Sequence, residues 1–180
     1  MKKFSTNQGF TLLEVIIYIT IVGVVLSTLM TYALNIMEIG SKSSTIQEVS
    51  ANTRYVSERI KYLVRNADNI DFASSDFSVN LADNPGTKII LFEPSPDQNT
   101  TITVVNGILT LNQASTGFNP IALNSNLTKV TDLTFTNYSA ADDKTKYLGF
   151  VLRLESAYGS SRQEYQQSVS LQSGAELRSN

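Results

Sequence analysis

The chain has 180 residues, a formal net charge of −2, and no cysteine, histidine or tryptophan. Without cysteine there is no disulfide framework and no thiolate nucleophile or metal ligand, and without histidine there is no imidazole base and no zinc site of the usual kinds. The acidic balance argues against nucleic acid as the main partner. The length fits one domain, or one domain with an appendage.

The N-terminal third predicts a membrane anchor. A short polar leader carrying Lys2 and Lys3 precedes an apolar stretch that begins at Phe10, and Glu14 is the only charged residue between Phe10 and Met37. The uncharged run after Glu14 would form a helix of roughly 35 Å, enough for the ~30 Å hydrocarbon core of a bilayer. Because lysines stay on the cytoplasmic side, we expect a single-pass protein of the cytoplasmic membrane whose C-terminal region lies in the periplasm or at the cell exterior.

Two simpler interpretations of the apolar stretch compete with this one: a cleaved secretory signal peptide and a plain signal anchor. A signal peptide has a shorter apolar core and a small-residue cleavage site, whereas this run is long and 29–33 is a poor site. A plain anchor, with Tyr18 and Tyr32 as an interfacial pair, leaves Glu14 unexplained unless it reaches the interface. A carboxylate in the bilayer costs roughly 2.5–3.5 kcal/mol on insertion scales, so its default interpretation is functional.

One short segment lies between the leader and the uncharged run, and residues 9–14 read GFTLLE. It resembles the processing site of type IV prepilins and type II secretion pseudopilins. The resemblance implies that a membrane aspartyl peptidase cuts after Gly9 and methylates the new amine of Phe10. Glu14 is then expected to pair with the N-terminal amine of a neighbouring subunit during assembly. Two features depart from the family pattern: Gln8 replaces a basic residue before the cut, and the apolar run has no proline.

The resemblance implies a structural subunit of minor pilin or pseudopilin type rather than an enzyme. Its implied partners are the prepilin peptidase, other pilin or pseudopilin subunits, membrane lipid, and an assembly platform with its ATPase. The stretch Tyr55 to Ala67 is loosely similar to minor pilins and J-type minor pseudopilins. The alternative function is an uncleaved, membrane-anchored binding module with an extracytoplasmic β domain. If the chain is a pilin or pseudopilin subunit, residues 1–9 are a cleaved leader and residues 10–37 are the transmembrane and assembly helix.

Beyond Met37 the helix is expected to continue to Asn66 as an amphipathic segment, residues 38–66. Apolar positions recur there at helical spacing on one face, with a threonine filling one gap. These positions are Ile46, Val49, Thr53, Val56, Ile60, Leu63 and Val64. Charged side chains largely fill the opposite face. We expect the apolar stripe to pack on a β-sheet.

Residues 67–180 are expected to form an antiparallel β head domain. Asn106-Gly107 between two β-branched runs is a strong hairpin signal, and a two-residue loop would pair Val104 with Leu109 and Ile102 with Leu111. The expected strands are 88–92, 101–105, 108–112, 121–123, 130–136, 147–155 and 163–172. The predicted fold class is therefore α+β and pilin-like, with a long N-terminal helix packed on an antiparallel β-sheet.

No catalytic constellation, phosphate loop or nucleic-acid motif is recognisable in the sequence, and we expect no cofactor and no metal site. Acidic and amide residues cluster loosely without the spacing of a calcium loop, at Asp68, Asn69, Asp71 and Asp76 and again at Asp142 and Asp143. Charge is divided unevenly: residues 38–66 carry 3 acidic and 5 basic side chains, and residues 67–180 carry 12 and 7. This asymmetry raises the hypothesis that a basic helix surface packs against acidic head domains, although single surface charges contribute little.

Overall fold

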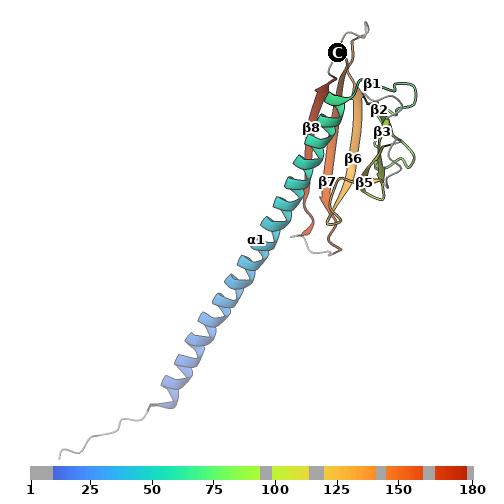
Figure 1. The fold of residues 1–180 in the computed structure, drawn as a ribbon. Coiled ribbons are helices and arrows are strands. Elements are labelled where there is room, and N and C mark those ends of the chain that lie inside the picture. Colours follow the sequence, from blue (N-terminus) through green and yellow to red (C-terminus); the bar gives the residue numbers. More distant parts are fainter. Residues whose placement is uncertain (1–9, 94–98, 114–119, 141–144, 160–164, 178–180) are drawn as a thin grey trace, which may run out of the picture. The chain divides into compact units, whose positions relative to one another are not determined.

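The computed structural model describes residues 10–93, 99–113, 120–140, 145–159 and 165–177. The chain forms two compact units, Met1–Ser41 and Lys42–Asn180. A single long helix, α1 (Leu12–Asn66), contributes its first part to one unit and its last turns to the other. Figure 1 shows this helix and the strands that follow it. The helix ends at Asn66, the residue at which the sequence predicts its end.

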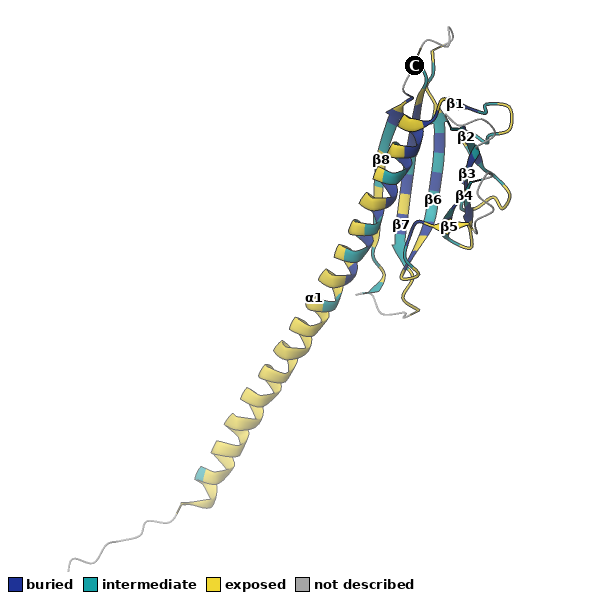
Figure 2. Cartoon of the chain, viewed as in Figure 1, coloured by how far each residue is buried: buried dark blue, intermediate teal, exposed yellow. Residues whose placement is uncertain are grey.

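In the first unit, α1 exposes its apolar side chains on every side. All residues from Phe10 to Gly40 are exposed except Glu14, which is half-buried (Figure 2). Four of the hydroxyls are satisfied within the helix, because Thr20, Ser27, Thr28 and Thr31 each donate to the carbonyl four residues earlier at 2.6–3.0 Å. By length and composition α1 can cross a membrane, as the sequence predicts.

In the second unit, one face of α1 is buried. Its buried residues are Thr45, Val49, Thr53, Val56, Ser57, Ile60, Leu63 and Val64, and Figure 2 shows them on the side of the helix that packs on the strands. The prediction for Ile46 was wrong, because Ile46 is 41% exposed. Thr45 occupies the stripe instead, since it lies four residues before Val49 and therefore on the same helix face.

The strands form two antiparallel sheets. The first has the order β1 (Asn69–Ile70), β2 (Ile89–Phe92), β3 (Asn99–Val105), β4 (Ile108–Gln113) and β5 (Ile121–Ala122). The second has the order β6 (Thr128–Asn137), β7 (Tyr147–Ser156) and β8 (Ser168–Glu176). The α+β, pilin-like class is confirmed, with α1 packed on antiparallel strands. The expectation of one sheet is corrected to two.

The buried side chain of Asn124 lies between the two sheets. Its Oδ1 accepts the Leu109 amide at 2.8 Å, and its Nδ2 donates to the Thr128 carbonyl at 2.7 Å and to the Gly107 carbonyl at 3.3 Å. The Leu109 amide is thus bonded to this side chain, while the Leu109 carbonyl accepts the Leu123 amide at 2.9 Å beside β5. Asn124 therefore links β4 to the segment that leads into β6.

The hairpin between β3 and β4 has the predicted register. Val104 pairs with Leu109 and Ile102 with Leu111. Asn106 and Gly107 both have positive φ, at 51° and 77°, as a two-residue type I′ turn requires. Inward and outward residues of β7 also alternate as predicted, with Leu148, Phe150, Leu152 and Leu154 buried.

Two strands differ from expectation. The turn-rich stretch after Asn66 contains β1, which the sequence does not predict and which pairs with β2. The last strand, β8, begins at Ser168 and ends at Glu176, later than the expected 163–172, of which 163–164 lie outside the described residues. The inward-facing positions of β8 continue from Val169 and Leu171 to Ser173 and Ala175. Because serine and alanine are small, the alternation of large apolar residues does not predict this last part of the strand.

One hydrophobic cluster joins α1 to both sheets. It includes Val56 and Ile60 of α1, Ile102 of β3, and Phe135 and Phe150 of β6 and β7. The rings of Phe135 and Phe150 lie 5.8 Å apart. Two polar contacts fix the helix against the loops: Asn52 Oδ1 accepts the Ser125 amide at 3.1 Å, and Glu48 accepts the Tyr158 hydroxyl at 2.9 Å.

Candidate functional site

The start of α1 is built by a local capping interaction. Thr11 directly precedes the helix, and its Oγ1 accepts the amide of Glu14 at 3.3 Å. The Thr11 carbonyl accepts the amide of Val15 at 3.3 Å. A threonine followed three residues later by glutamate is the spacing of a capping box. Glu14 therefore lies in the first helical turn, where the helix dipole favours a carboxylate.

Phe10, Glu14 and Tyr18 are spaced by four residues, so they share one side of the helix start. The Tyr18 hydroxyl donates to Glu14 Oε1 at 3.3 Å. The Tyr18 ring meets the Phe10 ring edge to face, with centroids 6.3 Å apart and an interplanar angle of 76°. One tyrosine thus contacts both predicted site residues. The sequence places Tyr18 only as an interfacial aromatic, and the spacing of four was the signal that links it to Glu14.

The predicted site residues differ in what the structure describes. Gly9 and the rest of the leader lie outside the described residues. Phe10 precedes the helix and is 73% exposed. Within the described ranges Glu14 makes no ion pair, and a carboxylate with one hydroxyl donor keeps further acceptor capacity. The Glu14 carboxylate can therefore accept a cationic group that does not belong to the described ranges.

Two of the loosely clustered acidic residues after α1 accept backbone amides. Asp71 Oδ1 accepts the amides of Ala73 and Ser74 at 3.1 Å, and hydrogen bonds from Ser74, its side chain first, lower the pKa of Asp71. Asp76 Oδ2 accepts the Lys88 amide at 2.9 Å. No group of three metal-ligating side chains occurs among the residues searched, which are those the structure describes; Asp142 and Asp143 lie outside them.

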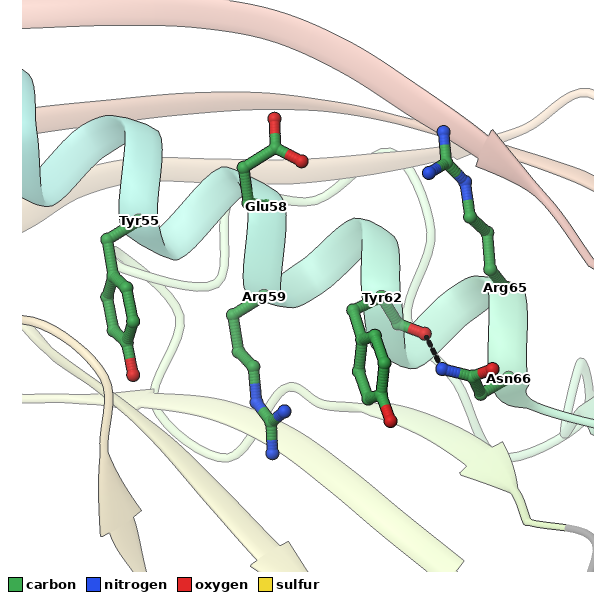
Figure 3. A pocket seen from close by; sticks show the side chains of 6 residues that line it. All are labelled: Tyr55, Glu58, Arg59, Tyr62, Arg65 and Asn66. Carbon is green, nitrogen blue, oxygen red and sulfur yellow. Dashed lines mark hydrogen bonds between the residues drawn. The ribbon is translucent and has the colours of Figure 1, made fainter.

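A shallow surface groove lies on the exposed side of the last turns of α1. It is lined by Tyr55, Glu58, Arg59, Tyr62, Arg65 and Asn66. Figure 3 shows Tyr55, Arg59 and Tyr62 pointing to one side of the helix and Glu58 and Arg65 to the other. The Arg59 guanidinium lies 5.2 Å from the centroid of the Tyr62 ring, in a cation–π contact. The sequence analysis assigned the charged members of this set to the charged helix surface and gave the tyrosines no such role.

Comparison with known proteins gives one match. A family model described as the prokaryotic N-terminal methylation motif matches residues 4–30. These residues include Gly9, Phe10 and Glu14. Neither the curated proteins nor the solved structures gave a match. The J-type resemblance stays a prediction. The methylation motif and the long helix on antiparallel sheets together support a type IV prepilin-like protein.

Proposed function

We propose that the chain is a structural subunit, of minor pilin or pseudopilin type, in a type IV pilus-like or type II secretion-like filament. Prepilin peptidase removes residues 1–9 by cutting after Gly9 and methylates the new amine of Phe10. Residues 10–37 form the transmembrane and assembly helix, residues 38–66 its amphipathic continuation, and residues 67–180 the β head domain. The observation that carries the proposal is the methylation motif over residues 4–30.

The apolar surface of the first unit supports this proposal. Its side chains are exposed around the whole helix from Leu12 to Ile39. A helix that is apolar on all sides needs an apolar surrounding, because burial of such surface yields about 25 cal/mol per Å². Lipid supplies that surrounding before assembly, and the helices of other subunits supply it in a filament. The partners are therefore membrane lipid, other pilin or pseudopilin subunits, the peptidase, and an assembly platform with its ATPase.

The Glu14 carboxylate can accept further hydrogen bonds, and this supports an intersubunit role. In a low-dielectric environment an unpaired carboxylate is costly, and an opposite charge within a few ångströms offsets much of that cost. The methylated amine of Phe10 on a neighbouring subunit is such a charge. The pair fixes the register of one helix against the next. Tyr18 holds the carboxylate before that partner arrives, since its hydroxyl already bonds Glu14.

The leader and the helix together set the topology. Lys2 and Lys3 precede the apolar run, and such residues hold their end of the chain in the cytoplasm. The β head domain then lies in the periplasm or at the cell exterior. Its role in the filament is structural rather than catalytic.

A pair of glutamate variants tests the proposal in the native host. Glu14→Leu is expected to insert and to be processed, yet to be lost from the filament fraction sheared from the cells. Glu38→Leu is the matched control, because Glu38 is an exposed glutamate of the same helix outside the uncharged run, and it should assemble as the wild type does. Normal assembly of Glu14→Leu would contradict the assembly role of Glu14. Wild-type chain that keeps residues 1–9 and is missing from the filament fraction would instead favour an uncleaved, membrane-anchored binding module.

A further inference from the structure

An open groove lies on the outer face of the sheet β6–β7–β8, the face turned away from buried side chains such as Phe135 and Leu148. Its volume is about 470 Å³, which falls within the roughly 300–1,000 Å³ of small-molecule sites. All three strands contribute to it. Its lining includes Thr136 of β6, Tyr138 just after β6, Tyr147 and Gly149 of β7, and Gln172 and Gly174 of β8.

Two tyrosine rings form the aromatic part of this groove. The rings of Tyr138 and Tyr147 lie 6.2 Å apart at an interplanar angle of 52°. Each tyrosine lies over a glycine, Gly149 or Gly174, so both side chains lie close to the backbone of the sheet. Tyr138 is nonetheless 60% exposed. A ring that rests on the backbone with its other side in solvent offers a flat apolar surface that is positioned before any ligand binds.

Uncharged hydrogen-bonding groups accompany the rings. Thr136, Tyr147 and Gln172 all line the groove, and within the described ranges their side chains make no hydrogen bond to another residue. A primary amide has two donors and an acceptor oxygen, and a hydroxyl can both donate and accept. These groups can therefore bond a ligand that carries several hydroxyls.

The charges around the groove do not select an ionic ligand. None of the lining residues, all of them in the described ranges, is charged. Arg153 of β7 lies two positions beyond the groove and faces Asp132 on the neighbouring strand. Glu176 of β8 lies two positions beyond the groove at its other end and lines a neighbouring groove together with Arg65. Since each flanking charge has an opposite charge beside it, and a bound ion would lose water without gaining a charged partner, the groove favours a neutral ligand.

A sugar ring combines the properties that this lining requires. One face of a pyranose carries C–H groups that pack on an aromatic ring, and its rim carries neutral hydroxyls that donate and accept hydrogen bonds. A purely aromatic ligand would leave the Gln172 amide and the Thr136 hydroxyl without partners, which lowers affinity. We propose that the groove binds a neutral sugar unit of a glycan, with the sugar ring on Tyr138 and its hydroxyls bonded by Gln172 and Tyr147.

The first test is saturation-transfer-difference NMR on the full chain, in a phosphocholine detergent because many other detergents carry a sugar headgroup. The probes are the methyl pyranosides of glucose, galactose, mannose and N-acetylglucosamine, beside glucuronate, glucosamine and indole, with a protein-free micelle sample as the blank. Transfer to the C–H protons of at least one neutral pyranoside is expected. No transfer from any of them at about 10 mM, tenfold above weak millimolar binding, would overturn the proposal, and so would a preference for the charged sugars or for indole.

The second test compares variants by titration with the pyranoside that binds best. Tyr138→Ala is expected to raise its Kd about tenfold or more, because it removes the aromatic surface. Gln172→Ala leaves both rings in place and should raise the Kd about two- to tenfold, as expected for lost hydrogen bonds. Tyr62→Ala is the matched control, since Tyr62 is a similarly exposed tyrosine, 57% against 60%, outside this groove.

Both variants keep the proposal falsifiable even if one of them perturbs the fold. Tyr138→Phe retains the ring that covers Gly149 and should bind within about threefold of wild type, because the hydroxyl that it loses is not assigned to the sugar. A wild-type Kd for both Tyr138→Ala and Gln172→Ala would show that the sugar binds elsewhere and would overturn the assignment. Equal weakening by Tyr62→Ala would do the same.

The inference goes beyond the proposed function and can fail independently of it. Binding is measured on the solubilised chain and requires no filament, and the N-terminus is sequenced from the same sample. A chain that begins at Met1 and binds the sugar would refute the proposed processing and keep the groove. A chain that begins at Phe10 and binds no neutral sugar would keep the processing and remove the groove's ligand.

Discussion

Gly149 of β7 lies directly opposite Gly174 of β8, and a tyrosine ring covers each of the two glycines. A Cβ on Gly149 would lie 2.6 Å from the Tyr138 ring, and one on Gly174 would lie 2.5 Å from the Tyr147 hydroxyl. The two tyrosine rings are 6.2 Å apart. Glycine weakens a strand, and here its absent side chain makes room for this aromatic pair on the outer face of the sheet.

Replacement of Gly174 by alanine is expected to destabilise the second unit by about 1–3 kcal/mol. The new Cβ would meet the Tyr147 ring, which can move, and the Leu148 carbonyl at 2.9 Å, which belongs to the paired strand and cannot. Denaturant unfolding of the full chain in detergent, followed by tyrosine fluorescence, measures the change. Gly40→Ala is the control, because nothing lies within 4 Å of its Cβ position. Equal stability of the two variants would contradict this account of the glycine pair.

Asn124→Ala is expected to lower the free energy of unfolding by about 2–4 kcal/mol, because the Leu109 amide and the Thr128 carbonyl lose their buried partner. The same unfolding experiment measures it. Asn126→Ala is the control, since Asn126 is exposed in the same loop and should change stability by less than about 0.5 kcal/mol. A near-neutral Asn124→Ala would mean that this amide does not stabilise the junction between the sheets.

Tyr18→Phe separates the two contacts of Tyr18. It keeps the ring that meets Phe10 and removes the hydroxyl that bonds Glu14. If the hydroxyl positions the carboxylate, the share of chain recovered in filaments should fall about two- to tenfold, the range expected for one hydrogen bond. Tyr18→Leu, which loses both contacts, should fall further. Wild-type assembly by Tyr18→Phe would show that only the ring matters.

The lowered pKa of Asp71 leads us to expect that the head domain loses stability at acidic pH. Hydrogen bonds lower its pKa in the folded chain, so its contribution to stability is complete above its unfolded pKa of about 3.9 and is lost as the pH falls through the lower folded value. Asp71→Asn cannot titrate. The melting temperature of this variant should therefore decline less steeply than that of wild type below about pH 4. Parallel pH profiles for the two proteins would contradict the assignment.

Much of the local structure could be predicted because its causes are local. The Asn106-Gly107 turn fixes the register of its own hairpin, and the alternation from Leu148 to Leu154 fixes the inward face of β7. The candidate site is likewise proposed from one segment, GFTLLE of residues 9–14. Such features need only neighbouring residues. The helix stripe was predicted except at two positions: Thr45 is buried in place of Ile46, and the buried Ser57 was not predicted.

The features that the sequence did not reveal depend on distant partners. Residues Asn69 and Ile70 form a strand only because β2 pairs with them. The junction between the two sheets includes the Asn124 side chain, which bonds Leu109 on β4, fifteen positions earlier in the chain.

The measurement that tests the central claim most directly is the intact mass and N-terminal sequence of the protein recovered from its host membrane. The account predicts a chain that begins at Phe10 and carries one added methyl group on its N-terminal amine. A chain that still begins at Met1 would contradict it. Glu14 would then be an interfacial carboxylate, and the protein an uncleaved anchored module whose β domain binds a ligand.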